Sequence, residues 1–358
     1  MPSQTDWLAS LSPWPEEFGL GRMHALLAEL GQPQRAYPAI HVVGTNGKST
    51  ATRRAAAFLV REGLMVGAYT SPHVSGWSER IQIDGSDADF EAAIARVREP
   101  AERIGATQFE TLTAAALAEF AAAGVEAAVV EAGLGGRLDA TNVLDARVVV
   151  LTNVSLDHTD VLGETRGQIA REKLAVVGAG AVVVLGESGW EQVAQAQGAR
   201  EVVLVEDTGR AAAERFLGRD LPGDVDVSIP GRLDFDGDDV FAGAHNPAGV
   251  EWLAARLPRA DYIICAAILA DKDARAMLAT LSRLGTAFIA TATHTERALK
   301  ADDLAELARE FFADVESVPD GITALDRARE LAGPSGAVLV TGSLYLLRDL
   351  FGRLESVR

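Results

Sequence analysis

The sequence predicts an α/β protein, with a mainly parallel sheet in its first part and a second, smaller α/β unit after it. Its 358 residues exceed a typical single core. Short apolar, β-branched runs alternate with Ala- and Leu-rich segments of helical period, a pattern typical of a parallel sheet covered on both faces. A stretch rich in Gly, Pro and Asp interrupts this alternation over residues 205–240. We therefore expect ligands to bind beyond the carboxyl ends of the strands.

Taken in chain order, five apolar runs predict the strands of the first part, and the helical segments between them end in glycine, as helix carboxyl caps often do. These strands are expected at residues 39–44, 64–71, 127–133, 147–154 and 181–187. The stretch at 205–240 indicates a linker and the start of a second domain. The alternation then resumes to the end of the chain, so we divide it into domains 1–228 and 229–358.

Composition disfavours several classes of function. The formal net charge of −18 opposes binding to nucleic acid or to an anionic membrane. No run of 18 apolar residues appears, and the first residues lack the features of a secretory signal. The single cysteine, Cys265, lies in an apolar run and is expected to be buried, which leaves no disulfide within the chain and no cysteine metal site. We expect a cytoplasmic monomer.

The stretch after the first predicted strand predicts a phosphate-binding loop. The glycines let backbone N–H groups converge on phosphate oxygens at a helix amino terminus, the lysine can reach the β- and γ-phosphates, and a hydroxyl can bind Mg²⁺. Val42 stands where the common G-x-x-x-x-G-K-[ST] pattern has its first glycine, which removes no phosphate-contacting group. A plain strand–turn–helix with a surface lysine is the less favoured alternative. The loop residues are Gly44, Thr45, Asn46, Gly47, Lys48, Ser49 and Thr50.

Three further residues are candidates by position. Glu131 ends an apolar strand beside the expected phosphate loop, which favours a metal ligand over a merely solvated carboxylate. His158 follows the next strand end, and Lys173 lies in the helical segment after it. A lone histidine is more often structural than functional, and a lysine in such a helix is ordinarily a surface cation. The residues alone leave His158 and Lys173 undecided.

Several segments also match a known family, in its order and over nearly the whole chain. They are GTNGKST, YTSPHVSGWSERIQIDG, EAGLGGRLDATNV, LTNVSLDHTDVLG with REK, IPGRLDF, AGAHNPAG, ILADKD and VTGSLYL. The chain resembles the Mur ligase superfamily and, through LGGRLDATN and TGSLY, its folylpolyglutamate synthase/dihydrofolate synthase branch. The resemblance implies a P-loop Mur-ligase-type domain that binds ATP, residues 1–228. It implies a smaller Rossmann-like domain of glutamate-ligase type, residues 229–358.

The resemblance also implies roles for particular residues. ATP would be held by the phosphate loop, and Mg²⁺ would occupy two sites. Lys173 matches a lysine that is carbamylated in the family. The expected catalytic residues are Lys48, Lys173 and His245; the expected metal ligands are Ser49, Ser71, Glu131 and His158; and the expected nucleotide contacts outside the loop are Arg232, Asn246 and Asp271.

The implied activity is ATP-dependent ligation. ATP would phosphorylate the carboxylate of dihydropteroate, of a folate, or of both, and the α-amine of L-glutamate would attack the acyl phosphate. The alternatives are a Mur-type ligase for another acid and amino acid, and a degenerate module that binds nucleotide without ligating. The joint presence of Lys48, Glu131, His158 and Lys173 favours an active enzyme.

The chain departs from the family's pattern in three places. Ser49 directly follows Lys48, where the family usually has GKGS. Ala242 replaces the aspartate of the usual DGAHNP motif. Residues 205–230 contain no recognisable H-x-x-N-A-A segment, whose asparagine normally helps to hold adenine. These departures affect the adenine contact and the second-domain site more than the fold.

Overall fold

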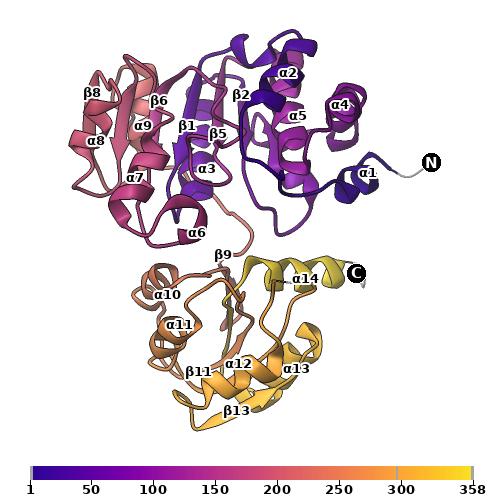
Figure 1. Cartoon of the computed structure of the whole chain (residues 1–358). Helices are drawn as coiled ribbons and strands as arrows, with labels where there is room; N and C mark the ends of the chain where they lie inside the picture. Colours follow the sequence, from indigo (N-terminus) through magenta and orange to yellow (C-terminus); the bar gives the residue numbers. More distant parts are fainter. Residues whose placement is uncertain (1–2, 296, 356–358) are drawn as a thin grey trace. The chain divides into compact units, whose positions relative to one another are not determined.

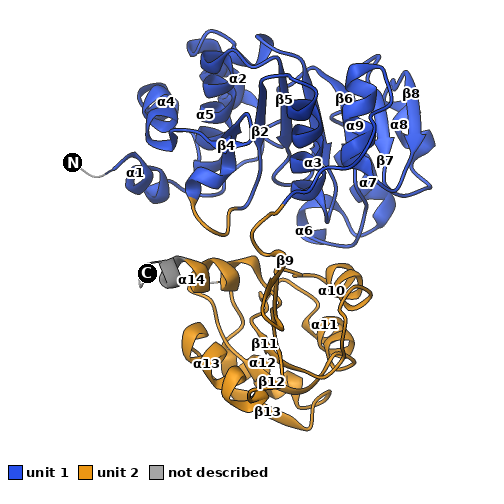
Figure 2. Ribbon diagram, turned by 180° about the vertical axis from the view of Figure 1, so that it is seen from behind, with its two compact units in different colours: residues 1–72, 77–227 blue, residues 73–76, 228–358 orange. Residues whose placement is uncertain are grey.

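The computed structural model describes residues 3–295 and 297–355. Its contacts divide the chain into two compact units, each an α/β structure built on one sheet (Figure 1). Unit 1 comprises residues 1–72 and 77–227, and unit 2 comprises residues 73–76 and 228–358 (Figure 2). The segment 73–76 therefore belongs to unit 2, although its sequence neighbours on both sides belong to unit 1.

The sheet of unit 1 contains all five strands that the sequence predicts. Its strands are β1 (Ala39–Val43), β2 (Val66–Tyr69), β3 (Ile81–Ile83), β4 (Ser86–Asp87), β5 (Ala127–Glu131), β6 (Ala146–Leu151), β7 (Val182–Leu185) and β8 (Glu201–Leu204). They lie in the order β4-β3-β2-β5-β1-β6-β7-β8, and within this sheet only the β2–β3 and β3–β4 pairs are antiparallel. The mainly parallel sheet is thus confirmed. The carboxyl ends of β1, β5 and β6 lie side by side, because β1 pairs in parallel with both neighbours.

Helices cover both faces of this sheet, since its strands are apolar on both faces. Ile40 and Val42 share a core with α3 and α9, whereas Ala39 packs on the opposite face with α2, α4 and α5. The described helices of unit 1 are α1 (Gln4–Ser10), α2 (Gly21–Glu29), η1 (Pro33–Arg35), α3 (Lys48–Arg61), η2 (Trp77–Arg80), α4 (Phe90–Ile104), α5 (Gln108–Ala123), α6 (Thr159–Leu162), α7 (Arg166–Leu174), α8 (Glu191–Ala196) and α9 (Thr208–Leu217).

Helix α9 lies in the stretch that the sequence predicts to be a linker, so that prediction is wrong for residues 208–217. Three consecutive alanines, residues 211–213, are buried in the core shared with α3. Gly209 approaches α3 so closely that a Cβ there would lie 2.9 Å from the Ala51 carbonyl oxygen. Asp207 caps α9 and accepts a hydrogen bond from Arg54 of α3. The buried residues of this helix are all small, and the Gly and Asp residues around it are typical of a linker.

Unit 2 repeats the architecture on a smaller scale. Its strands are β9 (Arg232–Asp236), β10 (Asp239–Ala242), β11 (Tyr262–Ala266), β12 (Gly285–Ala290), β13 (Asp314–Ser317) and β14 (Val338–Thr341). They lie in the order β13-β12-β11-β14-β10-β9, with β9 antiparallel to β10 and the other pairs parallel. Its described helices are α10 (Pro247–Ala254), α11 (Ala274–Leu281), α12 (Ala301–Ala308), α13 (Gly321–Ala332) and α14 (Leu344–Glu355).

The segment 73–76 contributes directly to the core of unit 2. Val74 is 1% exposed and packs in a cluster that contains Phe241 and Leu347. A Cβ at Gly231 would lie 3.1 Å from a Val74 methyl group, so the glycine makes room for it. No described helix has the length and hydropathy needed to cross a membrane.

Candidate active site

The phosphate loop has the strand–loop–helix geometry that the sequence predicts. β1 ends at Val43, α3 begins at Lys48, and the loop between them needs glycine at both ends. Gly44 has φ 151° and Gly47 has φ 80°, in the region that side chains disfavour. The Lys48 Nζ donates to the Thr45 carbonyl oxygen at 3.2 Å. The 14-residue helix α3 directs the positive end of its dipole at this loop, which makes the loop an anion site within an acidic chain.

Two residues that the sequence analysis did not single out hold this loop from the neighbouring strand. Thr152 and Asn153 follow β6, and the Thr152 hydroxyl donates to the Asn46 carbonyl oxygen at 2.7 Å. The Asn153 side chain both accepts from the Asn46 N–H and donates to its carbonyl oxygen, at 2.9 and 3.1 Å. A Cβ at Gly44 would lie 1.9 Å from the Thr152 hydroxyl oxygen. Their position at a strand carboxyl end was the signal available in the sequence.

The carboxylate of Glu131 lies at the end of β5, next to the phosphate loop. One of its oxygens accepts from the Ser49 hydroxyl at 3.1 Å, and the other accepts from the Ser71 backbone N–H at 3.1 Å. Glu131 is 1% exposed, and both serines are buried. Arg53 of α3 donates to the hydroxyl of Thr70, which precedes Ser71. The structure therefore brings together three of the four predicted metal ligands.

These three residues suit a magnesium ion chemically. Carboxylate and hydroxyl oxygens are the donors that Mg²⁺ prefers, and one carboxylate is typical where the nucleotide's phosphates supply further oxygens. His158 lies in a left-handed conformation before α6, and its ring lies 3.8 Å from the Asp157 carboxylate. Within the described residues, no three His, Cys, Asp or Glu side chains are grouped closely enough to hold a metal ion. His158 as a ligand stays a prediction.

Lys173 is not the surface cation that its helix position suggests. It lies in α7, is 4% exposed, and its Nζ donates to the Gly44 carbonyl oxygen at 2.8 Å. Burial and the nearby Lys48 charge lower its pKa from 10.5 to about 7. A largely neutral amine thus lies directly beneath the phosphate loop at slightly alkaline pH.

The predicted residues of unit 2 occupy defined structural positions. Asn246 caps α10 by accepting from the Gly249 N–H at 2.8 Å, and the His245 Nδ1 lies 2.8 Å from the Gly243 carbonyl oxygen. Arg232 begins β9. Asp271 forms ion pairs with Lys272 at 3.2 Å and with Arg297 at 2.9 Å. Burial would raise the pKa of Asp271, but these two cations outweigh it and lower the pKa below its ordinary value.

Ala242 has a structural explanation. It ends β10, is 4% exposed and packs in the apolar cluster that contains Val240 and Leu339. A carboxylate in this position would require a partner to offset its loss of water. Alanine instead extends the core.

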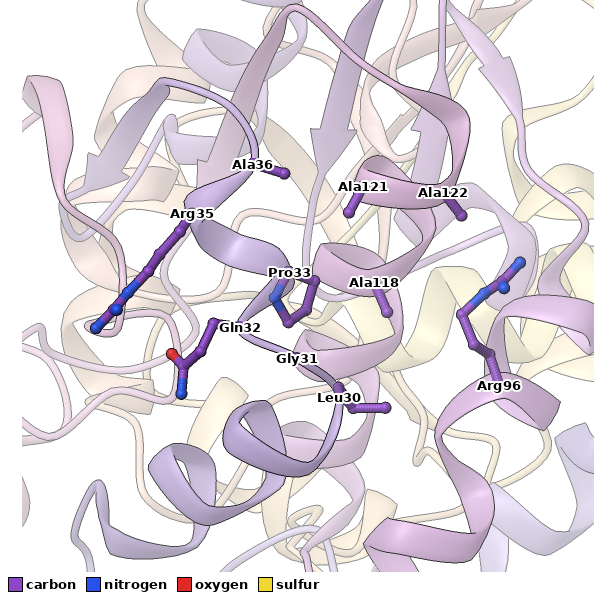
Figure 3. A pocket seen from close by; sticks show the side chains of 10 residues that line it. All are labelled: Leu30, Gly31, Gln32, Pro33, Arg35, Ala36, Arg96, Ala118, Ala121 and Ala122. Atoms are coloured by element: carbon purple, nitrogen blue, oxygen red, sulfur yellow. The ribbon is translucent and has the colours of Figure 1, made fainter.

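A separate cavity of about 670 Å³ lies in unit 1 (Figure 3). It is lined by the residues before β1 and by the carboxyl end of α5, which leads into β5. It therefore lies toward the amino ends of the strands, whereas Gly44 and Glu131 lie at their carboxyl ends. This position separates it from the phosphate site.

Both parts of the chain match families of known proteins. Residues 42–214 match the Mur ligase middle domain, and residues 231–344 match the Mur ligase, glutamate ligase domain. The dihydrofolate synthase/folylpolyglutamate synthase of Mycobacterium tuberculosis is 32% identical, over 95% of this chain and 92% of its own length.

Solved structures agree over both units. The Escherichia coli FolC complex with DHPP and ADP has a TM-score of 0.87 and 28% identity, and the match covers 100% of this chain and 99% of that one. A Yersinia pestis bifunctional folylpolyglutamate synthase/dihydrofolate synthase with Mn, AMPPNP and L-glutamate bound has a TM-score of 0.86 and 28% identity, over 99% and 98% of the two chains. The chain therefore belongs to the folylpolyglutamate synthase/dihydrofolate synthase family of Mur ligases.

Proposed function

We propose that this chain joins L-glutamate to dihydropteroate, to a folate, or to both, with ATP and a divalent metal ion bound in unit 1. As a member of its family it is an ATP-dependent carboxylate–amine ligase. The observation that carries the finer proposal is the meeting of Ser49, Ser71 and Glu131 beside the phosphate loop. The DHPP and ADP of the E. coli relative, and the Mn, AMPPNP and L-glutamate of the Y. pestis relative, support the choice of substrates.

The proposed reaction has two steps. A carboxylate oxygen of the acid attacks the γ-phosphorus of ATP and ADP leaves; the amine nitrogen of glutamate then attacks the acyl carbon, loses a proton and expels phosphate. Backbone N–H groups of the loop and Lys48 hold the phosphates and offset their charge. Mg²⁺, when bound, neutralises charge on the transferred phosphoryl group. We propose Ser49, Ser71, Glu131 and His158 as ligands for two ions.

Lys173 is proposed to carry a carbamate. Its neutral amine would attack the carbon of CO₂ and lose one proton, which turns a buried amine into a carboxylate-like group. The lowered pKa of Lys173, about 7, supports this, because only the neutral amine reacts. The hydrogen bond from Nζ to Gly44 holds the amine beside the phosphate loop.

We propose the remaining predicted residues as follows. His245 is a catalytic residue, and Arg232, Asn246 and Asp271 contact the nucleotide. The enzyme is proposed to work as a cytoplasmic monomer on small molecules, without nucleic acid or membrane partners.

The test is a ligation assay with ATP, Mg²⁺, L-glutamate and either dihydropteroate or tetrahydrofolate, read as phosphate release and product mass. We expect one glutamyl addition or more on at least one pterin. Phosphate release without added mass on either pterin would refute the substrate proposal, and ATP binding without turnover would favour a binding module. Lys173→Ala should abolish ligation and regain part of it with short carboxylic acids. Arg171→Ala, an exposed position on the same helix, serves as its control.

A further inference from the structure

A buried chain of hydrogen bonds runs from the strand under the phosphate loop to the glycine-rich loop after Glu131. His41 lies in the middle of β1 and is fully buried. Its Nε2 lies 2.7 Å from the Thr141 hydroxyl oxygen, and the Thr141 hydroxyl donates to a carboxylate oxygen of Asp139 at 2.5 Å. Thr141 is also fully buried, and Asp139 is 5% exposed. None of the three residues belongs to the proposed metal, nucleotide or catalytic residues.

The direction of these hydrogen bonds is fixed by counting protons. Burial raises the pKa of Asp139, but its carboxylate accepts from the Thr141 hydroxyl, the Thr141 N–H and the Leu134 N–H, and each of these hydrogen bonds favours the ionised, acceptor-only form. The hydroxyl has a single proton, which points to Asp139, so its oxygen must accept from His41. Burial lowers the pKa of His41 to about 4, so its neutral ring carries one proton. That proton lies on Nε2, and Nδ1 is buried without a partner among the described residues.

Asp139 accepts hydrogen bonds from the glycine-rich loop after Glu131, and this loop adjoins both Glu131 and the part of α7 that carries Lys173. The loop begins just after Glu131. A Cβ at Gly136 would lie 2.5 Å from the Lys173 carbonyl oxygen, so the loop backbone packs directly on α7. The Arg137 N–H donates to the Glu172 carbonyl oxygen at 3.0 Å. Lys173 in turn donates to Gly44, which follows β1, the strand that carries His41. These contacts connect β1, the loop after Glu131 and α7 to one another.

We infer that His41 is a positioning residue for ligation: its Nε2–H orients Thr141, which fixes Asp139 and, through the loop, the places of Glu131 and Lys173. This inference rests on the roles proposed for Glu131 and Lys173. An orphaned Nδ1 costs stability, whereas a well-shaped apolar side chain would avoid that cost. The hydrogen bond that its Nε2–H donates to Thr141 therefore explains why a histidine stands at position 41. Mutation of a residue that orients a metal ligand by a hydrogen bond typically lowers activity or metal affinity about 10- to 100-fold.

A matched pair of variants tests this inference. The side-chain nitrogen of Gln reaches about as far as Nε2, whereas that of Asn reaches only as far as Nδ1. Both variants bury an amide, but only His41→Gln keeps an N–H donor at the place of Nε2, where it can reach Thr141. We expect His41→Asn to lower kcat and the affinity for Mn²⁺, measured with a non-hydrolysable ATP analogue, about 10- to 100-fold. His41→Gln should stay within about threefold of the parent in both. Thr141→Val should resemble His41→Asn, and the double variant should lose little more, because the two residues act in series.

The readouts separate positioning from stability. A purely structural role would lower the melting temperature of His41→Asn but leave kcat per folded enzyme and Mn²⁺ affinity unchanged, which would overturn the inference. Equal losses in the Gln and Asn variants, or additive losses in the double variant, would also overturn it. Glu131→Gln is measured alongside. If it is inactive while His41→Asn is active, only the positioning role is wrong; if Glu131→Gln keeps full activity, the proposed metal site fails and the inference fails with it.

Discussion

Replacing Lys173 by methionine should make the metal-free protein more stable at neutral pH, although it removes a proposed catalytic residue. The residue is 4% exposed, and its pKa is lowered from 10.5 to about 7, first by burial and then by Lys48. Below pH 7 the folded protein therefore holds a buried ammonium group that the unfolded chain keeps in water. Methionine matches the length of the lysine stem without its charge.

The size of the effect follows from the pKa. One unit of pKa corresponds to about 1.36 kcal/mol, so a fall in the pKa of Lys173 from 10.5 to about 7 destabilises the folded protein with the charged amine by roughly 5 kcal/mol. The lost hydrogen bond to Gly44 offsets about 1 kcal/mol of this. Between pH 7 and 10.5 the unfolded chain binds more protons than the folded one, so stability of the parent rises with pH. Lys173→Met should thus gain about 4 kcal/mol at pH 6 and almost nothing near pH 9.5.

Urea unfolding at several pH values measures this difference. The buffers are purged of CO₂ and free of metal, so that the lysine stays unmodified. Lys300→Met, at an exposed position, is the control and should leave the pH dependence unchanged. A stability difference for Lys173→Met that does not vary with pH, or a loss of stability at pH 6, would refute the reasoning.

Three further predictions follow from close contacts and from the site. Gly44→Ala should weaken ATP binding at least about 100-fold by calorimetry, because its Cβ would overlap the Thr152 hydroxyl, which lies 1.9 Å away; unchanged affinity would contradict the loop geometry. Glu131→Gln should lower kcat about 100-fold and raise the Mg²⁺ concentration at half-maximal rate, while an unchanged Mg²⁺ titration would exclude Glu131 as a ligand. Gly67→Ala, whose Cβ would lie 2.5 Å from the Phe120 ring, should destabilise the fold by about 1–3 kcal/mol without changing KM for ATP, as thermal unfolding and steady-state kinetics would test.

The sequence predicts those features that depend on local pattern. The strand before the phosphate loop, the helix after it and the two glycines follow from short-range periodicity and from the turn that the loop requires. Glu131 was found because a strand carboxyl end is where a parallel sheet places ligands. Helix α9 does not follow from the same reasoning, since its buried residues are all small and the surrounding sequence is rich in Gly and Asp, as a linker would be.

Features that depend on the order of the strands in the sheet cannot be predicted from local sequence pattern. Asn153 holds Asn46 from 107 positions away, which required the knowledge that β6 lies next to β1. The His41–Thr141 contact spans 100 positions. Lys173 resembles a surface cation in its helix because its burial is decided by the glycine loop that packs on α7, not by its own neighbours. Tertiary contacts, rather than residue type, give these side chains their properties.

The placement of Val74 has a consequence for how this enzyme can be divided or recombined. Because a valine from residues 73–76 completes the core of unit 2, a gene fragment that begins at residue 228 encodes that unit without one of its interior side chains. A chimera that takes its carboxyl-terminal half from a relative must match Gly231 to whatever residue stands at position 74. Substitutions at positions 74 and 231 should therefore be chosen together in any such chimera.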